Sequence, residues 1–182
     1  MTTTKNPPPQ GPHPQESMGI DPYEKNWIKF SVALLLVFAT AVTVSGFALG
    51  YQLPGDEGRV DPRTILNEGP FSTPGLREIG ENKFEAYIVA RQYLFDPGTI
   101  TIPAGASIDL YITTPDVQHG FKVTDTNINM QIVPGQVSKL SFTFDRVGEY
   151  PIICHEFCGE GHAAMFGTIE VVPPTEFEGV AP

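Results

Sequence analysis

The chain has 182 residues, including 18 Gly and 18 Pro, and a formal net charge of −10. This length suits one domain with appendages, and so many turn-forming residues favour a β protein over a helical one. Residues 1–50 hold equal numbers of basic and acidic side chains, so the net charge belongs to residues 51–182. So acidic a surface either serves solubility alone or attracts a cationic partner, and it excludes nucleic acid as a partner.

Residues 1–26 contain the string PPPQGPHPQ and little apolar periodicity, which predicts a disordered tail. Residues 27–51 follow as a predicted transmembrane helix, because the stretch from Phe30 to Leu49 has neither charge nor proline. At about 1.5 Å per residue it spans about 30 Å, the thickness of a bilayer's hydrocarbon core. Trp27 and Tyr51 flank it as interfacial aromatic residues do. A signal peptide, the alternative, has a shorter apolar region and does not usually follow such a tail.

The charges that flank the apolar stretch do not orient it. Lys25 and Lys29 precede it, and Arg59 and Arg63 follow it, so the positive-inside comparison is a tie.

Residues 52–82 are predicted to be an irregular connector, because Pro and Gly recur along them. From residue 83 to residue 173, apolar and polar side chains alternate in short runs that turn signals such as Pro134-Gly135 separate. About seven short strands in this length predict a mainly-β fold, a Greek-key sandwich or barrel. Residues 174–182 are left as a C-terminal tail.

The segment CHEFCGEGHAAMFG begins at Cys154 and holds both cysteines, two of the four histidines and one of the four methionines. A disulfide between Cys154 and Cys158 would close a short loop, which gains least from closure, and would leave His162 and Met165 without a role. A closed zinc site made from both thiolates and two histidines would leave Met165 idle. Both alternatives therefore rank below copper, for which thiolate, imidazole and thioether together are typical.

A blue-copper site takes two His, one Cys and a weak axial Met. Cys158, His162 and Met165 supply three of these ligands, and His119, just after a predicted strand, is the candidate for the fourth. Cys154 adds a second thiolate, so the favoured site has two copper ions, bridged by both sulfurs and each capped by one histidine. Met165 and a backbone carbonyl of the loop between the cysteines would fill the weak axial positions. Four other histidines and methionines are predicted to bind no metal: His13, His155, Met18 and Met130.

The string Cys-His-Glu-Phe-Cys-Gly-x-x-His-x-x-Met, with Asp-Val-x-His before it at residues 116–119, resembles the copper A domain of cytochrome c oxidase subunit II. The resemblance covers about residues 87–172. It implies a cupredoxin fold for residues 83–173. It also implies a set of metal ligands with the Glu156 carbonyl as the sixth: His119, Cys154, Glu156, Cys158, His162 and Met165.

The resemblance further implies a subunit of a proton-translocating oxidoreductase in the plasma membrane. Such a subunit accepts electrons from a soluble cytochrome c at two copper ions and passes them to heme in subunit I, where oxygen is reduced. The helix would cross the lipid once, with its N-terminus cytoplasmic and the copper domain on the outer, periplasmic face. Two alternatives stay open: the copper A subunit of a nitric oxide reductase, and a membrane-tethered copper chaperone.

The chain departs from the usual family pattern in two respects. One predicted helix instead of two resembles the short subunit II of B-type heme–copper oxidases. The family's usual tryptophan near the copper is missing, because Trp27 is the only Trp. Tyr93 and Phe95 are predicted to line the surface where electrons enter, although packing within a strand is an alternative role for both.

Two acidic residues are assigned supporting roles. Glu156 aligns with a residue that in longer relatives helps to hold magnesium at the subunit I boundary, so magnesium is a further candidate cofactor. Asp116 is predicted to accept the second ring proton of His119, as carboxylates near metal-bound histidines do, or else simply to shape the turn.

Overall fold

The computed structural model describes residue 19, residues 21–50 and residues 55–180. The chain divides into two units, Met1–Gly50 and Tyr51–Pro182. Most of the predicted N-terminal tail lies outside the described residues, and so does Tyr51.

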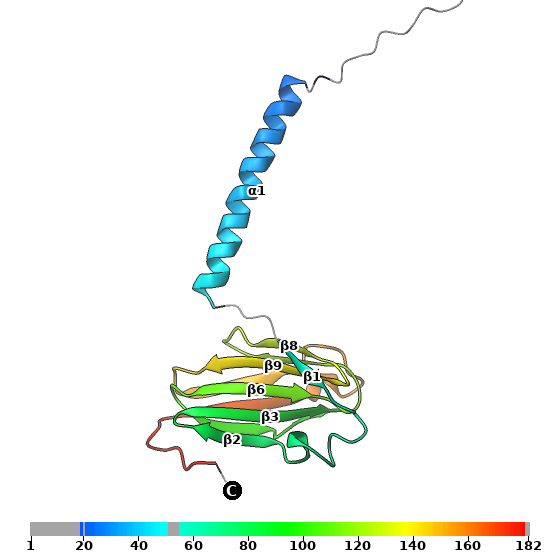
Figure 1. The fold of residues 1–182 in the computed structure, drawn as a ribbon, viewed down its shortest axis with the longest axis vertical. Helices are drawn as coiled ribbons and strands as arrows, with labels where there is room; N and C mark the ends of the chain where they lie inside the picture. Colours follow the sequence, from blue (N-terminus) through cyan, green and yellow to red (C-terminus); the bar gives the residue numbers. More distant parts are fainter. Residues whose placement is uncertain (1–18, 20, 51–54, 181–182) are drawn as a thin grey trace, which may run out of the picture. The chain divides into compact units, whose positions relative to one another are not determined.

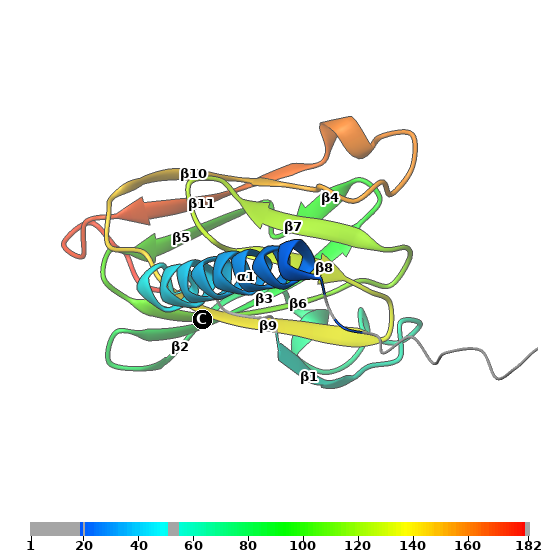
Figure 2. The same ribbon diagram turned by 90° about the horizontal axis from the view of Figure 1, so that it is seen from above.

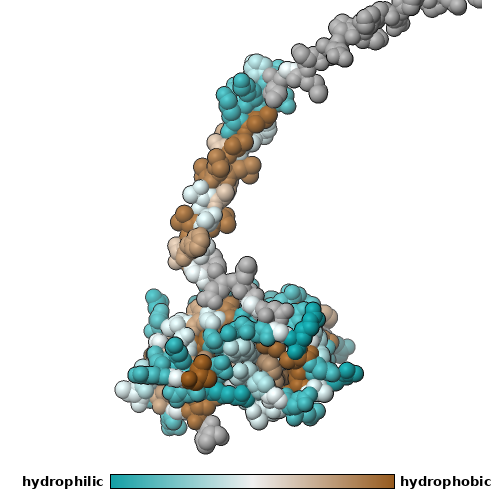
Figure 3. All heavy atoms as spheres, viewed as in Figure 1, coloured by the Kyte–Doolittle hydropathy of each residue, from teal (hydrophilic) through white to brown (hydrophobic). Residues whose placement is uncertain are grey.

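Helix α1 (Pro22–Ala48) is the predicted membrane span, and it begins five residues before the predicted start. The Asp21 side chain accepts a hydrogen bond of 2.7 Å from the Tyr23 amide, and Pro22 sits in the first turn, where a missing N–H costs nothing. None of the helix's residues is buried, and its central part is apolar (Figure 3). Among the described residues, this is the one helix long and apolar enough to cross a membrane.

Residues 55–180 form two β-sheets that pack face to face (Figures 1 and 2). One sheet has the order β1-β9-β6-β3-β2, with β4 paired to β3, and the other has the order β5-β11-β10-β7-β8. The pairs β3/β6 and β5/β11 are parallel, and the other pairs are antiparallel. The strands are β1 (Gly55–Arg59), β2 (Gly75–Gly80), β3 (Lys83–Arg91), β4 (Leu94–Asp96), β5 (Thr99–Pro103), β6 (Ser107–Thr113), β7 (His119–Val123), β8 (Asn129–Ile132), β9 (Gln136–Thr143), β10 (Gly148–Ile153) and β11 (Phe166–Val172), with short 3₁₀ helices η1 (Pro70–Ser72) and η2 (His162–Ala164). The predicted mainly-β, cupredoxin-like sandwich is confirmed.

The core lies between the sheets because apolar and polar residues alternate along each strand. In β3, Ala86, Ile88 and Ala90 are fully buried, and Ile108 and Leu110 of the neighbouring β6 are buried beside them. Burial of one Ile or Leu side chain contributes about 1.5–3 kcal/mol, so the alternation provides most of the stability of the sandwich.

The structure departs most from the prediction in residues 52–82, which were expected to form an irregular connector. This segment contains strands β1 and β2, which lie at the two edges of one sheet. Both strands are rich in charge and glycine, so they lack the alternation that marks a half-buried strand. The segment between them also packs. Ile65 and Phe71 join Val89 and Val137 in a second small core on the face of the sheet that points away from the main core.

Two other boundaries also move. The apolar run from Phe84 to Phe95 divides into β3 and β4, and residues 83–173 hold nine strands instead of about seven. Beyond the predicted end of the domain, the Phe177 ring packs edge-on against Phe84, with 5.5 Å between the ring centroids.

The second core predicts that Phe71→Ala destabilises the sandwich. Phe71 is 3% exposed, and its ring meets Tyr87 edge-on at 5.4 Å, so truncation should lower the free energy of unfolding by about 3–5 kcal/mol. Denaturant unfolding of the full chain, followed by circular dichroism, measures this change. Ile79→Ala, at a side chain that is 55% exposed, should change it by less than about 1 kcal/mol. Equal effects of the two substitutions would show that residues 60–72 do not stabilise the sheet.

Candidate metal centre

The ends of three neighbouring strands carry the predicted ligands. β7 begins at His119, β10 ends just before Cys154, and β11 begins just after Met165. β10 lies between the other two and is antiparallel to both, and its last residue, Ile153, pairs with Phe166 of β11. The loop of residues 154–165 therefore lies at the same end of the sheet as His119.

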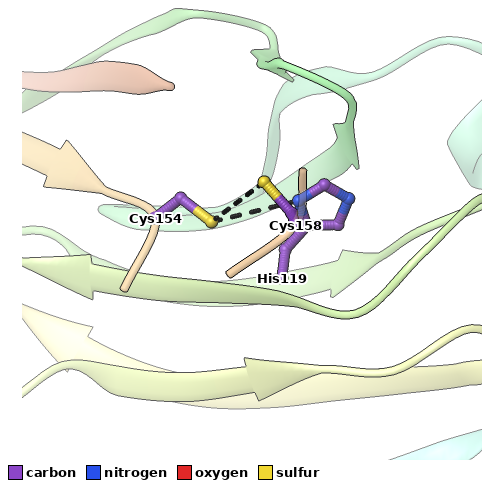
Figure 4. A group of neighbouring side chains, drawn as sticks. All are labelled: His119, Cys154 and Cys158. Atoms are coloured by element: carbon purple, nitrogen blue, oxygen red, sulfur yellow. Dashed lines mark hydrogen bonds between the residues drawn. The ribbon is translucent and has the colours of Figure 1, made fainter. Parts of the chain in front are cut away.

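The two sulfurs face each other, and each has its own histidine. Cys154 Sγ lies 3.8 Å from Cys158 Sγ and 4.0 Å from His119 Nδ1 (Figure 4). On the other side of the pair, Cys158 Sγ lies 3.7 Å from His162 Nδ1. The arrangement therefore consists of two thiol–imidazole pairs that meet at the sulfurs.

Two further donors complete the set. Met165 Sδ lies 3.8 Å from Cys158 Sγ, and the Glu156 backbone oxygen lies 3.3 Å from Cys154 Sγ. The structure thus brings together all six residues that the sequence singled out as ligands.

The disulfide alternative does not fit this geometry. A disulfide holds its sulfurs about 2.05 Å apart, whereas Cys154 Sγ and Cys158 Sγ are 3.8 Å apart and both cysteines are free. The pair is also buried, with Cys154 7% and Cys158 4% exposed.

The donor set fits a soft metal ion. Atoms that bind one ion at about 2.0–2.3 Å lie about 3–4 Å from one another, which is the range of separations found here. Thiolate, imidazole and thioether donors select copper over harder ions. Within the described part of the chain, His119, Cys154 and Cys158 form the one group of three or more His, Cys, Asp or Glu residues with ligand atoms this close together.

Burial makes the Cys158 thiol reluctant to ionise without a metal. Burial, reinforced by the hydrogen bond with Cys154, raises the pKa of Cys158 to about 11. Because copper binds the thiolate, metal uptake must displace this proton, and the metal then supplies the positive charge that the buried sulfurs lack.

Asp116 fixes the orientation of the His119 ring. Its Oδ1 atom lies 2.8 Å from His119 Nε2, which leaves Nδ1 facing the sulfurs. Burial favours the neutral form of Asp116, but hydrogen bonds from His119 and from the Gln92 and Val117 amides outweigh it and hold the pKa of the carboxyl below its ordinary value. Asp116 also accepts a hydrogen bond from Thr114, so it supports the turn as well as the histidine.

The two aromatic residues predicted to line the surface where electrons enter lie in different places. Tyr93 is 38% exposed and lies against Gly159 and Gly161 of the ligand loop. Phe95 is only 2% exposed and packs edge-on against Phe121 in the core, so it cannot line an exposed surface. The packing role weighed for both residues from the sequence is the one that Phe95 has.

The structure describes two of the four residues that were predicted to bind no metal. Met130 is a core residue, 1% exposed, and the His155 ring packs over Gly120. His13 and Met18 lie outside the described residues.

Sequence reasoning missed two residues that shape the site. The Gln92 side chain donates a hydrogen bond to the Cys158 carbonyl. Gly120 follows His119 directly, and a Cβ atom there would lie 2.7 Å from the His155 ring and 2.8 Å from the Glu156 amide nitrogen. A glycine beside a ligand was a signal for close backbone approach, but a lone glutamine gave no signal.

Comparisons with known proteins agree with this geometry. A family model described as the periplasmic domain of cytochrome c oxidase subunit II matches residues 77–172. A cytochrome c oxidase subunit 2 of Thermus thermophilus is 45% identical over 153 residues, which cover 82% of this chain and 91% of that protein. A second Thermus thermophilus subunit 2 sequence is 44% identical over 133 residues, which cover 72% of this chain and 98% of the relative.

Among solved structures, a chain from a cryo-EM structure of a heme-copper terminal oxidase dimer is similar with a TM-score of 0.69 and 32% identity. The similarity covers 82% of this chain and 99% of that chain, so it extends over nearly the full length of the solved chain.

The close approach at Gly120 predicts that Gly120→Ala weakens metal binding. The added Cβ would meet backbone as well as a side chain, so β7 and the ligand loop must move apart, and His119 moves away from Cys154. We expect the amount of copper retained by the full chain at a fixed chelator concentration to fall about tenfold or more. Loss of a contact that positions a metal ligand has an effect of this size. Gly80→Ala is the matched control, because a Cβ there meets nothing within 4 Å. Copper retention equal to that of the control would contradict the role given to this contact.

Proposed function

Because this chain belongs to the cytochrome c oxidase subunit II family, we propose that it accepts electrons from a soluble cytochrome c at two copper ions and passes them to heme in subunit I. The membership itself makes the chain a copper-binding, membrane-anchored subunit of a heme–copper oxidase, in which it has the electron-accepting role. The observation that carries the finer proposal is the pair of buried, unbonded sulfurs, each with its own histidine.

The paired arrangement supports two metal ions instead of one. Cys154 with His119 and Cys158 with His162 form the two halves of the site. The two sulfurs lie 3.8 Å apart, so each would be close to a metal ion in either half. Two copper ions held by Cys154, Cys158, His119 and His162 would supply one-electron transfer at this centre.

The remaining donors leave no room for a substrate at the metal. The Met165 sulfur lies on the Cys158 side and the Glu156 carbonyl lies on the Cys154 side, where each would add a further weak donor to a bound metal. Met165 is 1% exposed and His119 is fully buried, so water has little access to these donors. The residues of this chain therefore hold an electron relay, and oxygen reduction belongs to the heme-bearing subunit.

Exposed apolar side chains around the ligand loop support docking of an electron donor there. Phe157 is 79% exposed and lies 5.9 Å from the His162 ring, and Phe166, which follows Met165, is 59% exposed. Tyr93 touches the same loop from the β3–β4 turn. A donor cytochrome with an apolar contact patch and a basic rim would match both these residues and the net charge of −10.

Family membership supports our proposals for the membrane orientation and for a magnesium site. We place the N-terminus of α1 in the cytoplasm and the sandwich on the periplasmic face of the plasma membrane, because the matched family domain is described as periplasmic. The Glu156 carboxylate is partly exposed and lies 3.5 Å from Gln118 Nε2 and 3.7 Å from His155 Nδ1. A magnesium ion at Glu156 would need most of its ligands from another chain.

The alternatives are less well supported. A copper chaperone exchanges its metal readily and therefore needs exposed ligands, whereas both sulfurs and His119 are buried here. The relatives above are cytochrome c oxidase subunits, so a nitric oxide reductase subunit is not favoured.

Copper analysis with electron paramagnetic resonance tests the two-copper centre. The wild-type chain should hold two copper ions with one unpaired electron shared between them. Cys154→Ser removes one bridging sulfur but leaves Cys158, His162 and Met165, so we expect a single copper with a blue-type spectrum. An unchanged two-copper signal in this variant would overturn the bridging role of Cys154.

The exposed ring of Tyr93 predicts a role in electron entry that is separate from copper binding. Tyr93→Leu should slow reduction by cytochrome c about tenfold, as loss of one important interface contact does, while the copper spectrum stays unchanged. Stopped-flow mixing with reduced cytochrome c measures this rate. Tyr93→Phe keeps the ring and should retain the wild-type rate. Equal rates for the Leu and Phe variants would place the docking surface elsewhere.

A further inference from the structure

The turn between β3 and β4 reaches both parts of the metal centre. It contains Gln92 and Tyr93, far in sequence from the ligands, and no residue of the turn is itself a predicted ligand. The backbone amide of Gln92 donates a hydrogen bond of 2.8 Å to Asp116 Oδ2, and Asp116 in turn orients His119. The backbone of Gln92 therefore supports His119 on β7 through Asp116.

The side chain of the same residue reaches the other ligand loop. Gln92 Nε2 donates a hydrogen bond to the Cys158 backbone carbonyl. A Cβ atom at Gly159 would lie 2.8 Å from this nitrogen and 2.5 Å from Tyr93 Oη, so the turn lies directly against the backbone that follows Cys158. Gly159 has a φ of +135°, a conformation that side chains rarely adopt, and this allows the close approach.

We propose that Gln92 is a positioning residue that joins the His119 side of the metal centre to the Cys158 side, fixes the Cys158 sulfur and tunes the reduction potential of the bound copper. The inference rests on the proposed copper centre. It adds a residue that is neither a ligand nor a direct partner of a ligand side chain.

Two physical effects give Gln92 this role. Residues 154–161 have no regular secondary structure, so the position of Cys158 depends on specific hydrogen bonds instead of a strand ladder. In addition, the amide donor places the positive end of its dipole beside the peptide that carries the bridging sulfur. A donor there stabilises the electron-rich, reduced state of the centre relative to the oxidised state.

Gln92 is well suited to substitution, because the residue is exposed and lies outside both cores. Gln92→Met keeps the length of the side chain and removes the donor. The backbone amide remains, so the hydrogen bond to Asp116 is retained. Gln92→Glu also keeps the length and, when ionised, replaces the donor with a negative charge. Gln131→Met is the matched control, since Gln131 is exposed on β8 beside β7, and no hydrogen bond from its side chain is seen among the described residues.

The first measurement is hydrogen exchange of the metal-free full-length chain. Loss of the bond to the Cys158 carbonyl should speed exchange in residues 154–161 about tenfold in Gln92→Met, which corresponds to about 1.4 kcal/mol. Exchange in the core strands should not change, and Gln131→Met should match the wild type. This measurement does not depend on copper or on electron-transfer activity.

The second measurement is the reduction potential of the copper-loaded chain, with its paramagnetic resonance spectrum. We expect a lower potential in Gln92→Met, a still lower one in Gln92→Glu, and an unchanged one in Gln131→Met. If the wild type lacks a two-copper spectrum, the proposed function fails. If the wild type has that spectrum but Gln92→Met matches Gln131→Met in both exchange and potential, the proposed role of Gln92 is wrong.

Discussion

The backbone pairing of β10 with both β7 and β11 is the constraint on which the metal centre depends. It brings His119 within 4.0 Å of Cys154, although 35 positions separate them in the sequence. The loop of residues 154–165 has little regular structure, yet it leaves β10 and enters β11 at fixed neighbouring points. The sandwich thus sets the distances between ligands, and the loop supplies their chemistry.

Burial gives the site its selectivity. The Cys158 thiol, whose pKa burial raises, is unreactive until a metal replaces its proton. The same burial separates the sulfurs from solvent, so the centre favours a soft metal ion over hard, strongly hydrated metal ions. Asp116 and Gln92 then supply the polar support that the buried ligands cannot find in the core.

Much of the fold and all six residues of the candidate metal centre could be predicted from the sequence, for reasons visible in particular residues. The alternation through β3 and β6 indicated strands with one buried face, and the spacing of Cys154, Cys158, His162 and Met165 indicated a metal. β1 and β2 were missed because edge strands with charge on both faces lack that alternation. Phe95 was misplaced because the chain turns at Gln92 and Tyr93, and neither of these residues is a typical turn former such as glycine or proline. Gln92 itself could not be found, because its partners lie 24 and 66 positions away.

The packing of Phe177 on Phe84 and of Phe71 on Tyr87 has a practical consequence for anyone who excises the soluble part of this protein. A fragment cut to the segment that carries the sequence motif, starting at residue 83 and stopping at residue 173, would expose two aromatic surfaces that the intact chain covers. The shortest fragment that keeps both aromatic contacts begins at β1 and includes Phe177. A shorter one would leave these rings uncovered, and exposed apolar surface of this kind favours aggregation.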